Sequence, residues 1–146
     1  MDTSKHQELP KIAWDWLTDK TSLTKRLKQF TQNKINFCLI QDWQLQNTQY
    51  SRKIEWRLNS DLWIKANLLL PQKSVNQDTK HLLEINTKPI GEILFEDPSL
   101  TRTDFLFHQE SDLIWTRESI FYFKEQPITL IETFYSDFFK ALIHAG

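Results

Sequence analysis

The stretch Leu113–Tyr135 decides the fold that we expect for this chain, and it reads LIWTRESIFYF, KEQP and ITLIETFY in order. Two runs rich in β-branched and aromatic residues flank the polar segment Lys124–Pro127, a pattern that predicts an antiparallel β-hairpin. Side chains of a strand alternate between its two faces. One face of the second run therefore carries Ile128, Leu130, Glu132 and Phe134.

Glu132 is the exception on this apolar face, because a buried carboxylate is costly unless a cation or a ligand meets it. The structural interpretation is a buried ion pair, or a glutamate at a strand end that reaches solvent. The functional interpretation is a carboxylate that lines a binding site. The pattern alone leaves both interpretations open.

A second hairpin is predicted over residues 50–70. Alternation in Tyr50–Leu58 places charged residues on one face and apolar residues on the other. Arg52 falls among the apolar set. The turn residues Asn59–Asp61 then lead into a returning strand, Leu62–Leu70. Arg52 is thus a second charged side chain that we expect to point inward.

The remaining segments read as short helices and strands. We expect helices over residues 12–17, 23–31, 90–96 and 136–145, the second of them capped by Thr21 or Ser22. We expect strands over residues 35–43 and 103–108, a polar connection over 44–49 and a loose start over 1–10. Because strands joined by short turns form antiparallel sheets, we predict one α+β domain spanning residues 1–146.

The composition is that of an ordinary soluble domain, with 146 residues, 40% of them hydrophobic, a net charge of −1 and a pI near 6.4. No basic excess indicates a nucleic-acid partner, and no segment indicates membrane insertion. The N-terminus lacks the apolar core of a signal peptide. The single cysteine, Cys38, fits a reducing compartment and is predicted to be a small core residue. We therefore expect a cytoplasmic monomer.

Several kinds of chemistry have no support in the sequence. The four histidines, His6, His81, His108 and His144, show no metal-ligand spacing with one another or with cysteine, so we expect no metal site. No glycine-rich phosphate loop and no nucleophile motif is present. The one internal glycine, Gly91, indicates either a positive φ or the close approach of another group.

Arg52 and Glu132 remain as an inward-pointing pair of opposite charges. They could simply neutralise each other. Alternatively, the guanidinium binds a planar carboxylate and the glutamate meets a hydroxyl group, which describes a pocket for a small carboxylated and hydroxylated ring. The backbone N–H groups of residues 87–91, and those of the helix start at Ser22–Leu23, could bind the same anion.

At these residues the chain resembles the chorismate–pyruvate lyase family, from about Trp16 to Tyr135. The resemblance depends on the order and spacing of several blocks, with Arg52 ten residues before the D-L-W at 61–63. The other blocks are SLTKRL at 22–27, KPIGEILF at 88–95, SLTR at 99–102, WTRES at 115–119 and PITLIETF at 127–134. The chain departs from the family in its short 44–49 connection, in Glu118, where an arginine often follows Arg117, and in its unmatched tail at 136–146.

The resemblance implies an antiparallel sheet of about six strands, with helices packed on one side as flaps over an enclosed ligand site. It also implies neither a metal nor an organic cofactor. The ligand-binding positions of the family fall on Leu23, Arg52, Ile90 and Glu132, with Arg52 and Glu132 as the catalytic candidates. The implied reaction converts chorismate into 4-hydroxybenzoate and pyruvate, the first step towards a prenylated quinone such as ubiquinone, and an enclosed aromatic product implies product inhibition.

Two other interpretations compete with the enzyme. One is a non-catalytic domain of the same fold that binds a small aromatic acid, as in the ligand-sensing domains of some transcription regulators. The other is a structural domain in which Arg52 and Glu132 form a buried ion pair.

Overall fold

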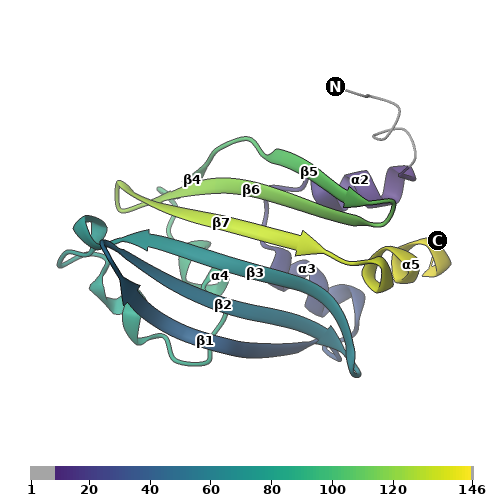
Figure 1. The fold of residues 1–146 in the computed structure, drawn as a ribbon, viewed down its shortest axis with the longest axis horizontal. Coiled ribbons are helices and arrows are strands. Elements are labelled where there is room, and N and C mark those ends of the chain that lie inside the picture. The colour runs from purple at the N-terminus through teal and green to yellow at the C-terminus, as the bar shows by residue number, and fades with distance from the viewer. Residues whose placement is uncertain (1–8, 146) are drawn as a thin grey trace.

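Seven strands form one antiparallel sheet in the computed structural model, which describes residues 9–145. The order across the sheet is β1-β2-β3-β7-β6-β4, and β5 also pairs with β6 (Figure 1). The strands are β1 Asn36–Gln46, β2 Gln49–Leu58, β3 Asp61–Pro71, β4 Thr101–Arg102, β5 Leu106–Ser111, β6 Ile114–Phe123 and β7 Gln126–Phe134. The predicted α+β class is confirmed, with one strand more than the resemblance implied.

The hairpin predicted from Leu113–Tyr135 is confirmed as β6 and β7. The turn between them is tighter than the predicted Lys124–Pro127, because Lys124 and Glu125 alone close it, with φ values of 50° and 70°. Two successive left-handed residues are typical of the type I′ turn, whose twist matches that of the flanking strands. Glu132 consequently lies directly opposite Arg117 of β6.

Predictions at the edges of the sheet were less accurate. The expected connection over 44–49 is wrong, because β1 continues to Gln46 and only Asn47 and Thr48 form the turn. The expected strand over 103–108 starts three residues later, at Leu106. Cys38 is only half-buried, since the edge strand β1 covers it less than a central strand would.

Helices and short 3-10 turns fill one face of the sheet, where α3 and α4 lie behind it in Figure 1. The α-helices are α2 Lys11–Leu17, α3 Leu23–Phe30, α4 Gly91–Leu94 and α5 Ser136–Ala145. The 3-10 helices are η1 Gln72–Ser74 and η2 Lys80–Glu84. Ser22 caps α3 by accepting a hydrogen bond from the Lys25 N–H at 3.1 Å. No helix within residues 9–145 is long and apolar enough to cross a membrane.

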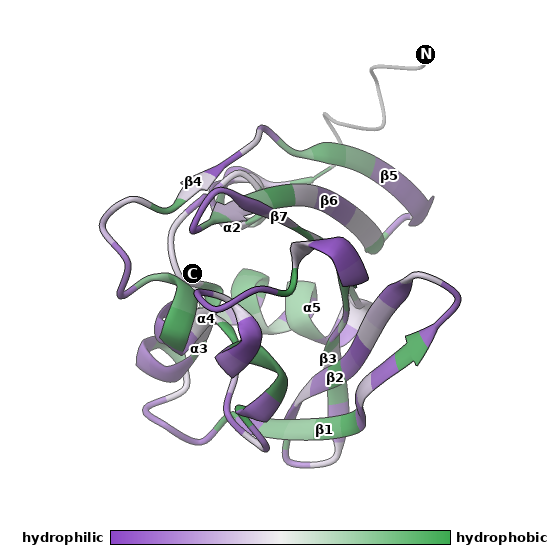
Figure 2. Ribbon diagram, turned by 90° about the vertical axis from the view of Figure 1, so that its left-hand side faces the viewer, coloured by the Kyte–Doolittle hydropathy of each residue, from purple (hydrophilic) through white to green (hydrophobic). Residues whose placement is uncertain are grey.

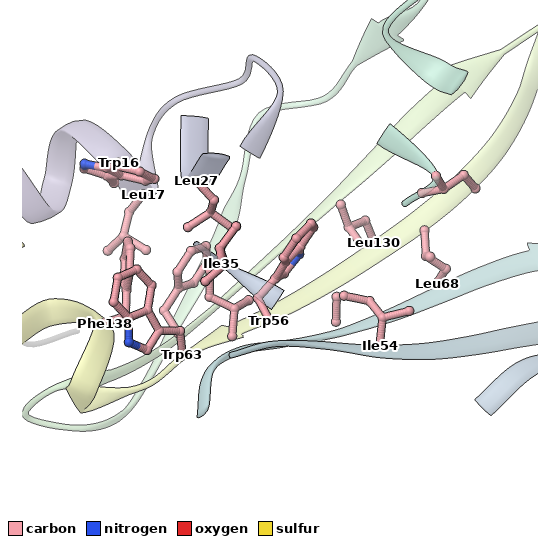
Figure 3. Close-up of a cluster of buried hydrophobic side chains, with 14 of the residues drawn as sticks. Trp16, Leu17, Leu27, Ile35, Ile54, Trp56, Trp63, Leu68, Leu130 and Phe138 are labelled. Carbon is pink, nitrogen blue, oxygen red and sulfur yellow. The ribbon is translucent and has the colours of Figure 1, made fainter. Parts of the chain in front are cut away.

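The core lies between the helices and the inward face of the sheet. Figure 3 shows Trp16, Leu17 and Leu27 of the helices packing towards Trp56 and Trp63 of the sheet. The end-on view in Figure 2 shows that α5 is largely hydrophobic, whereas the connecting loops are mostly hydrophilic. Burying these large side chains removes apolar area from water, which stabilises the fold.

Gly91 begins α4 without a positive φ, so the first of the two explanations for this glycine is wrong. An added Cβ would lie 3.4 Å from Thr24 Oγ1, which is ordinary contact. The nearest approach is that of α4 to α3, and because it leaves room for a Cβ, the second explanation does not require glycine at this position either. The predictions for His6 and for residues 1–8 of the loose start lie outside the described residues. Leu9, which belongs to the same predicted segment, is buried.

Candidate active site

One cavity brings together all four residues that the sequence singled out. It lies between the sheet and the start of α3 and α4, and Leu23, Arg52, Ile90 and Glu132 all line it. Its volume is about 60 Å³, several times the roughly 10–15 Å³ that one buried water requires. The apolar part of its wall comprises Phe37, Ile54, Trp56, Leu68, Phe121 and Leu130. The cavity is therefore an apolar chamber with a few charged groups.

The register of the sheet explains why Arg52 and Glu132 share this chamber. Arg52 of β2 lies opposite Leu68 of β3, which lies opposite Leu130 of β7, two residues before Glu132. The two charged residues therefore point to the same face, with one strand between them. Two strand spacings separate their backbones by about 10 Å across the sheet, so their side chains approach the chamber from opposite ends.

Arg52 is fully buried and only partly satisfied. Its Nη2 donates to the carbonyl oxygens of Asn86 and Lys88, at 2.8 and 2.9 Å. Within residues 9–145, its Nε and Nη1 donate no hydrogen bond, although the half-exposed Asp42 carboxylate lies 3.7 Å from Nε. Burial lowers the pKa of Arg52, and Asp42 partly offsets this. A buried guanidinium with open N–H groups is suited to bind a carboxylate.

Two backbone N–H groups beside the chamber also lack a hydrogen-bond acceptor among residues 9–145. Leu23 is the first residue of α3 and Ile90 is the residue before α4, so neither N–H has an acceptor within its helix. In the part of the chain that the structure describes, no other acceptor takes their place. The peptide N–H groups at helix starts favour anions. Together with Arg52, these groups place open N–H donors at one end of the chamber, an arrangement suited to an anion.

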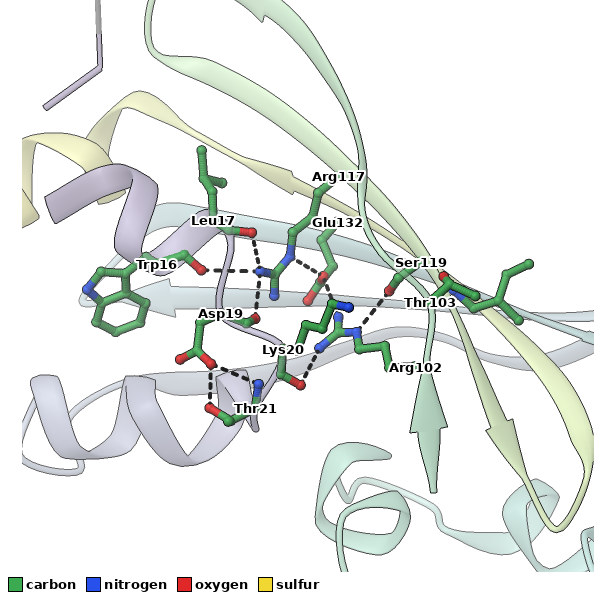
Figure 4. A network of polar contacts seen from close by, with 11 residues as sticks. Trp16, Leu17, Asp19, Lys20, Thr21, Arg102, Thr103, Arg117, Ser119 and Glu132 are labelled. Carbon is green, nitrogen blue, oxygen red and sulfur yellow. Dashed lines mark hydrogen bonds and ion pairs between the residues drawn. The ribbon is translucent and has the colours of Figure 1, made fainter. Parts of the chain in front are cut away.

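Glu132 is held between two arginines at the other end, as Figure 4 shows. Its Oε1 accepts a hydrogen bond from Arg117 Nε at 2.7 Å and lies 3.4 Å from Arg102 Nη2. The side chain is only 4% exposed. Because both arginines bind the same oxygen, the carboxylate is fixed in position while its second oxygen remains available for another donor.

Arg117 ties this carboxylate to the N-terminal part of the chain. Its Nη1 donates to the carbonyl oxygens of Trp16, Leu17 and Asp19, at 3.2, 2.8 and 3.2 Å. These acceptors are carbonyls at the end of α2 and just beyond it, where the helix leaves its last carbonyls short of intrahelical partners. Arg117 does not line the chamber, so it acts on the site through the groups that it holds.

Arg102 is the second partner of Glu132, and it does line the chamber. Its Nε donates to Ser119 Oγ at 3.0 Å and its Nη1 to the Lys20 carbonyl at 3.1 Å. The rings of Phe105 and Phe121 lie 4.6 and 4.4 Å from its guanidinium carbon. Burial lowers the pKa of Arg102 to about 10, with Glu132 opposing and Arg117 adding to the change. The group therefore remains a cation at neutral pH.

The sequence identified the two inward charges but not their partners. The interpretation in which Arg52 and Glu132 neutralise each other is wrong, because each binds other groups. Alternation along β6 could have identified Arg117, which shares a face with the buried residues Trp115, Phe121 and Phe123. Arg102 lies in a two-residue strand, too short for any period, and its role had no signal in the pattern.

The chamber offers anion binding and one fixed carboxylate. Among residues 9–145, no three His, Cys, Asp or Glu side chains gather as ligands for a metal ion. The arrangement suits a small molecule that carries negative charge at one end and a hydroxyl group at the other. The surrounding apolar wall strengthens each electrostatic contact by excluding water.

Comparisons with known proteins identify the family to which the chain is similar. A family model described as "Chorismate lyase" matches residues 2–142, beyond the Trp16–Tyr135 range of the quoted blocks and into the tail. A probable chorismate pyruvate-lyase from Coxiella burnetii is 29% identical, with 87% of each chain covered. Chorismate pyruvate-lyases from Photorhabdus laumondii and Proteus mirabilis are each 25% identical, over 86% and 92% of this chain and 82% and 86% of theirs.

Proposed function

The chain belongs to the chorismate lyase family, and on this basis we propose that it converts chorismate into 4-hydroxybenzoate and pyruvate. The observation that carries the proposal is the shared chamber of Arg52 and Glu132, with a half-satisfied cation at one end and a fixed carboxylate at the other. Chorismate likewise carries a carboxylate and a hydroxyl group at opposite positions of its ring.

We assign the ring carboxylate of chorismate to Arg52 and to the N–H groups of Leu23 and Ile90. The hydroxyl group at C4 then donates a hydrogen bond to Glu132. In this orientation the ring lies against the apolar wall, which includes Leu68 and Leu130. Fixing both ends of the ring selects one reactive conformer, which is a major part of the catalysis expected for a reaction within a single molecule.

The reaction itself can proceed within the substrate. The C3–O bond breaks as the hydrogen on C4 moves to the methylene carbon of the enolpyruvyl group. The C4–H electron pair forms the C3–C4 double bond of the aromatic ring, and the C3–O pair forms the carbonyl of pyruvate. The two products together contain every atom of chorismate. The protein then supplies position and charge, with Glu132 holding the C4 hydroxyl group and either remaining a hydrogen-bond acceptor or assisting proton transfer.

The experiment mixes the purified protein with chorismate and follows pyruvate and 4-hydroxybenzoate. Glu132→Gln and Arg52→Ala should each lower kcat by about 10²–10³, since each removes a charge-assisted contact to the transition state. Circular dichroism should show that both variants retain the fold. Near wild-type turnover in both variants would overturn the residue assignment.

The matched control is Glu118→Gln, which removes a carboxylate from β6 on the face opposite Arg117. Its turnover should stay within about twofold of wild type, as is usual for substitutions away from a site. Tight binding of 4-hydroxybenzoate by the wild-type protein without pyruvate release would instead favour a ligand-sensing domain. Neither binding nor release would favour a structural domain.

We further propose that the product serves a prenylated quinone such as ubiquinone, and that a monomer acts in the cytoplasm without metal or organic cofactor. The charged groups at both ends of the chamber support slow release and inhibition by 4-hydroxybenzoate, because an aromatic product bound by Arg52 and Glu132 must break both contacts to leave. Progress curves with added 4-hydroxybenzoate test the inhibition directly.

A further inference from the structure

Chorismate brings two carboxylates into the chamber, and Arg52 accounts for only one of them. Among residues 9–145, three charged side chains line the chamber, namely Arg52, Arg102 and Glu132. If Arg52 binds the ring carboxylate, the carboxylate of the enolpyruvyl group still needs a cation, because an unpaired charge in an apolar chamber is costly.

The substitution pattern of the ring determines where this second carboxylate lies. The hydroxyl group is on C4 and the enolpyruvyl ether is on the neighbouring C3, whereas the ring carboxylate is across the ring on C1. When the C4 hydroxyl group contacts Glu132, the enolpyruvyl group is attached to the ring atom next to C4. It must therefore lie near Glu132, at the end away from Arg52.

Two guanidinium groups bind Glu132, but only one of them faces the chamber. Arg117 donates its Nε to Glu132 and its Nη1 to three backbone carbonyls, and it does not line the chamber. Arg102 lines the chamber, and the contact of its Nη2 with Glu132 is long, at 3.4 Å. Each terminal nitrogen of a guanidinium carries two N–H groups, so Nη2 retains one for a ligand.

Arg102 is also held in place before any ligand arrives. Ser119 and the Lys20 carbonyl accept hydrogen bonds from its Nε and Nη1, and its guanidinium carbon lies over the rings of Phe105 and Phe121. A cation fixed in this way loses little side-chain entropy on binding an anion.

We propose that Arg102 binds the enolpyruvyl carboxylate of chorismate, the part of the substrate that leaves as pyruvate. This inference rests on the proposed function and adds a residue that discriminates between substrate and product. Arg102 also stabilises the negative charge that develops on the ether oxygen side as the C3–O bond opens. The product 4-hydroxybenzoate lacks this carboxylate, so it makes no contact that depends on Arg102.

The test compares substrate and product in one variant, Arg102→Gln. Its kcat/KM for chorismate should fall by about 100-fold, whereas its Kd for 4-hydroxybenzoate, measured by calorimetry, should stay within about threefold of wild type. Arg52→Ala should weaken both. A change in Arg102→Gln that is equal for the two ligands, or absent for both, would overturn the proposal.

Two further measurements keep the result interpretable. If Arg102→Gln fails to fold, Arg102→Lys replaces it, and the same selective loss for chorismate is expected, because an ammonium group keeps the charge but not the planar geometry. Arg57→Gln, which removes an arginine on the solvent face of β2, serves as the matched control with unchanged kinetics. Absence of pyruvate release by the wild-type protein would refute the proposed function itself, independently of Arg102.

Discussion

The two ends of the chamber satisfy their charged groups to different degrees. At the Arg52 end, one guanidinium donates to two backbone carbonyls and leaves Nε and Nη1 without hydrogen bonds among residues 9–145. At the Glu132 end, two arginines meet one carboxylate oxygen and also bind Ser119 and several backbone carbonyls. The Arg52 end therefore depends on a ligand for most of its remaining contacts, whereas the Glu132 end is more fully bonded within the protein and keeps the second Glu132 oxygen and one N–H of Arg102 Nη2 for a ligand.

This difference separates binding from support. Buried polar groups are costly when they lack partners, so the free energy that a ligand gains should be concentrated at the Arg52 end. The network of arginines at the Glu132 end instead stabilises the fold and fixes the position of Glu132. Substitutions at the two ends should consequently differ in which quantity they change, ligand affinity or stability.

The largest effect is expected for Arg117→Met, which removes the contacts of Arg117 at the Glu132 end of the chamber. Removing Arg117 leaves Glu132 with the longer contact to Arg102 alone among residues 9–145, and takes one donor from each of the carbonyls of Trp16, Leu17 and Asp19. The free energy of unfolding should fall by about 3–5 kcal/mol. Urea denaturation followed by tryptophan fluorescence measures it, and the low-temperature activity of any folded fraction shows the effect on the site.

Arg57→Met is the matched control for this prediction. Arg57 pairs with Glu55 on the solvent face, and its side chain is 35% exposed, so its loss should cost less than about 1 kcal/mol. Equal losses in the two variants would contradict the view that the network around Glu132 supports the fold.

A smaller effect is expected at the Arg52 end, and it should appear only with ligand. Arg52→Met replaces an incompletely bonded cation by an apolar side chain, a change that is often neutral for stability. With 4-hydroxybenzoate at 100 times its Kd, the wild-type protein should gain about 2.7 kcal/mol of stability. The variant should gain almost none of it at the same concentration. Thermal shift assays with and without ligand separate the two quantities, and a full shift in the variant would move the anion site away from Arg52.

These two ends also show what the sequence can and cannot predict. Alternation identified Arg52 and Glu132, because an ionised residue interrupts an apolar face at a known period. It could not identify their partners, because Arg117 binds the carbonyl of Leu17, 100 residues earlier in the chain. Such a contact depends on how the end of α2 docks against β6, and no local pattern encodes that.

Prediction of the fold also succeeded where the sequence pattern is local and failed where tertiary contacts decide. The central hairpins were predicted well, since each central strand has one buried face and a regular alternation. The edges were predicted poorly. Gln44 and Gln46 read as a connection because an edge strand is exposed on both faces. The Thr103 N–H still donates to the Ile120 carbonyl, but the chain then leaves the sheet until β5 begins at Leu106. In this segment Phe105 packs beside Arg102 and Arg117.

The smallest predicted effect concerns the outer rim of the Glu132 end, where the Asp19 carboxylate accepts hydrogen bonds from Thr21 and Arg26. Burial raises the pKa of Asp19, but these hydrogen bonds outweigh it, so that the pKa lies below its ordinary value.

A carboxyl group with a lowered pKa in the folded state stabilises the protein above its unfolded pKa of about 3.9, and this contribution disappears as the pH falls through the folded value. Asp19→Asn should therefore lower the free energy of unfolding at pH 7 by no more than about 1 kcal/mol, with the difference from wild type shrinking as the pH is lowered below about 4. Thr21→Val, which removes one of the donors, should show a smaller change with the same pH dependence. Urea denaturation of the three proteins at several pH values measures this. A difference between Asp19→Asn and wild type that persisted unchanged in acid would mean that the side chain acts through its shape, and that its charge contributes nothing to the rim of the site.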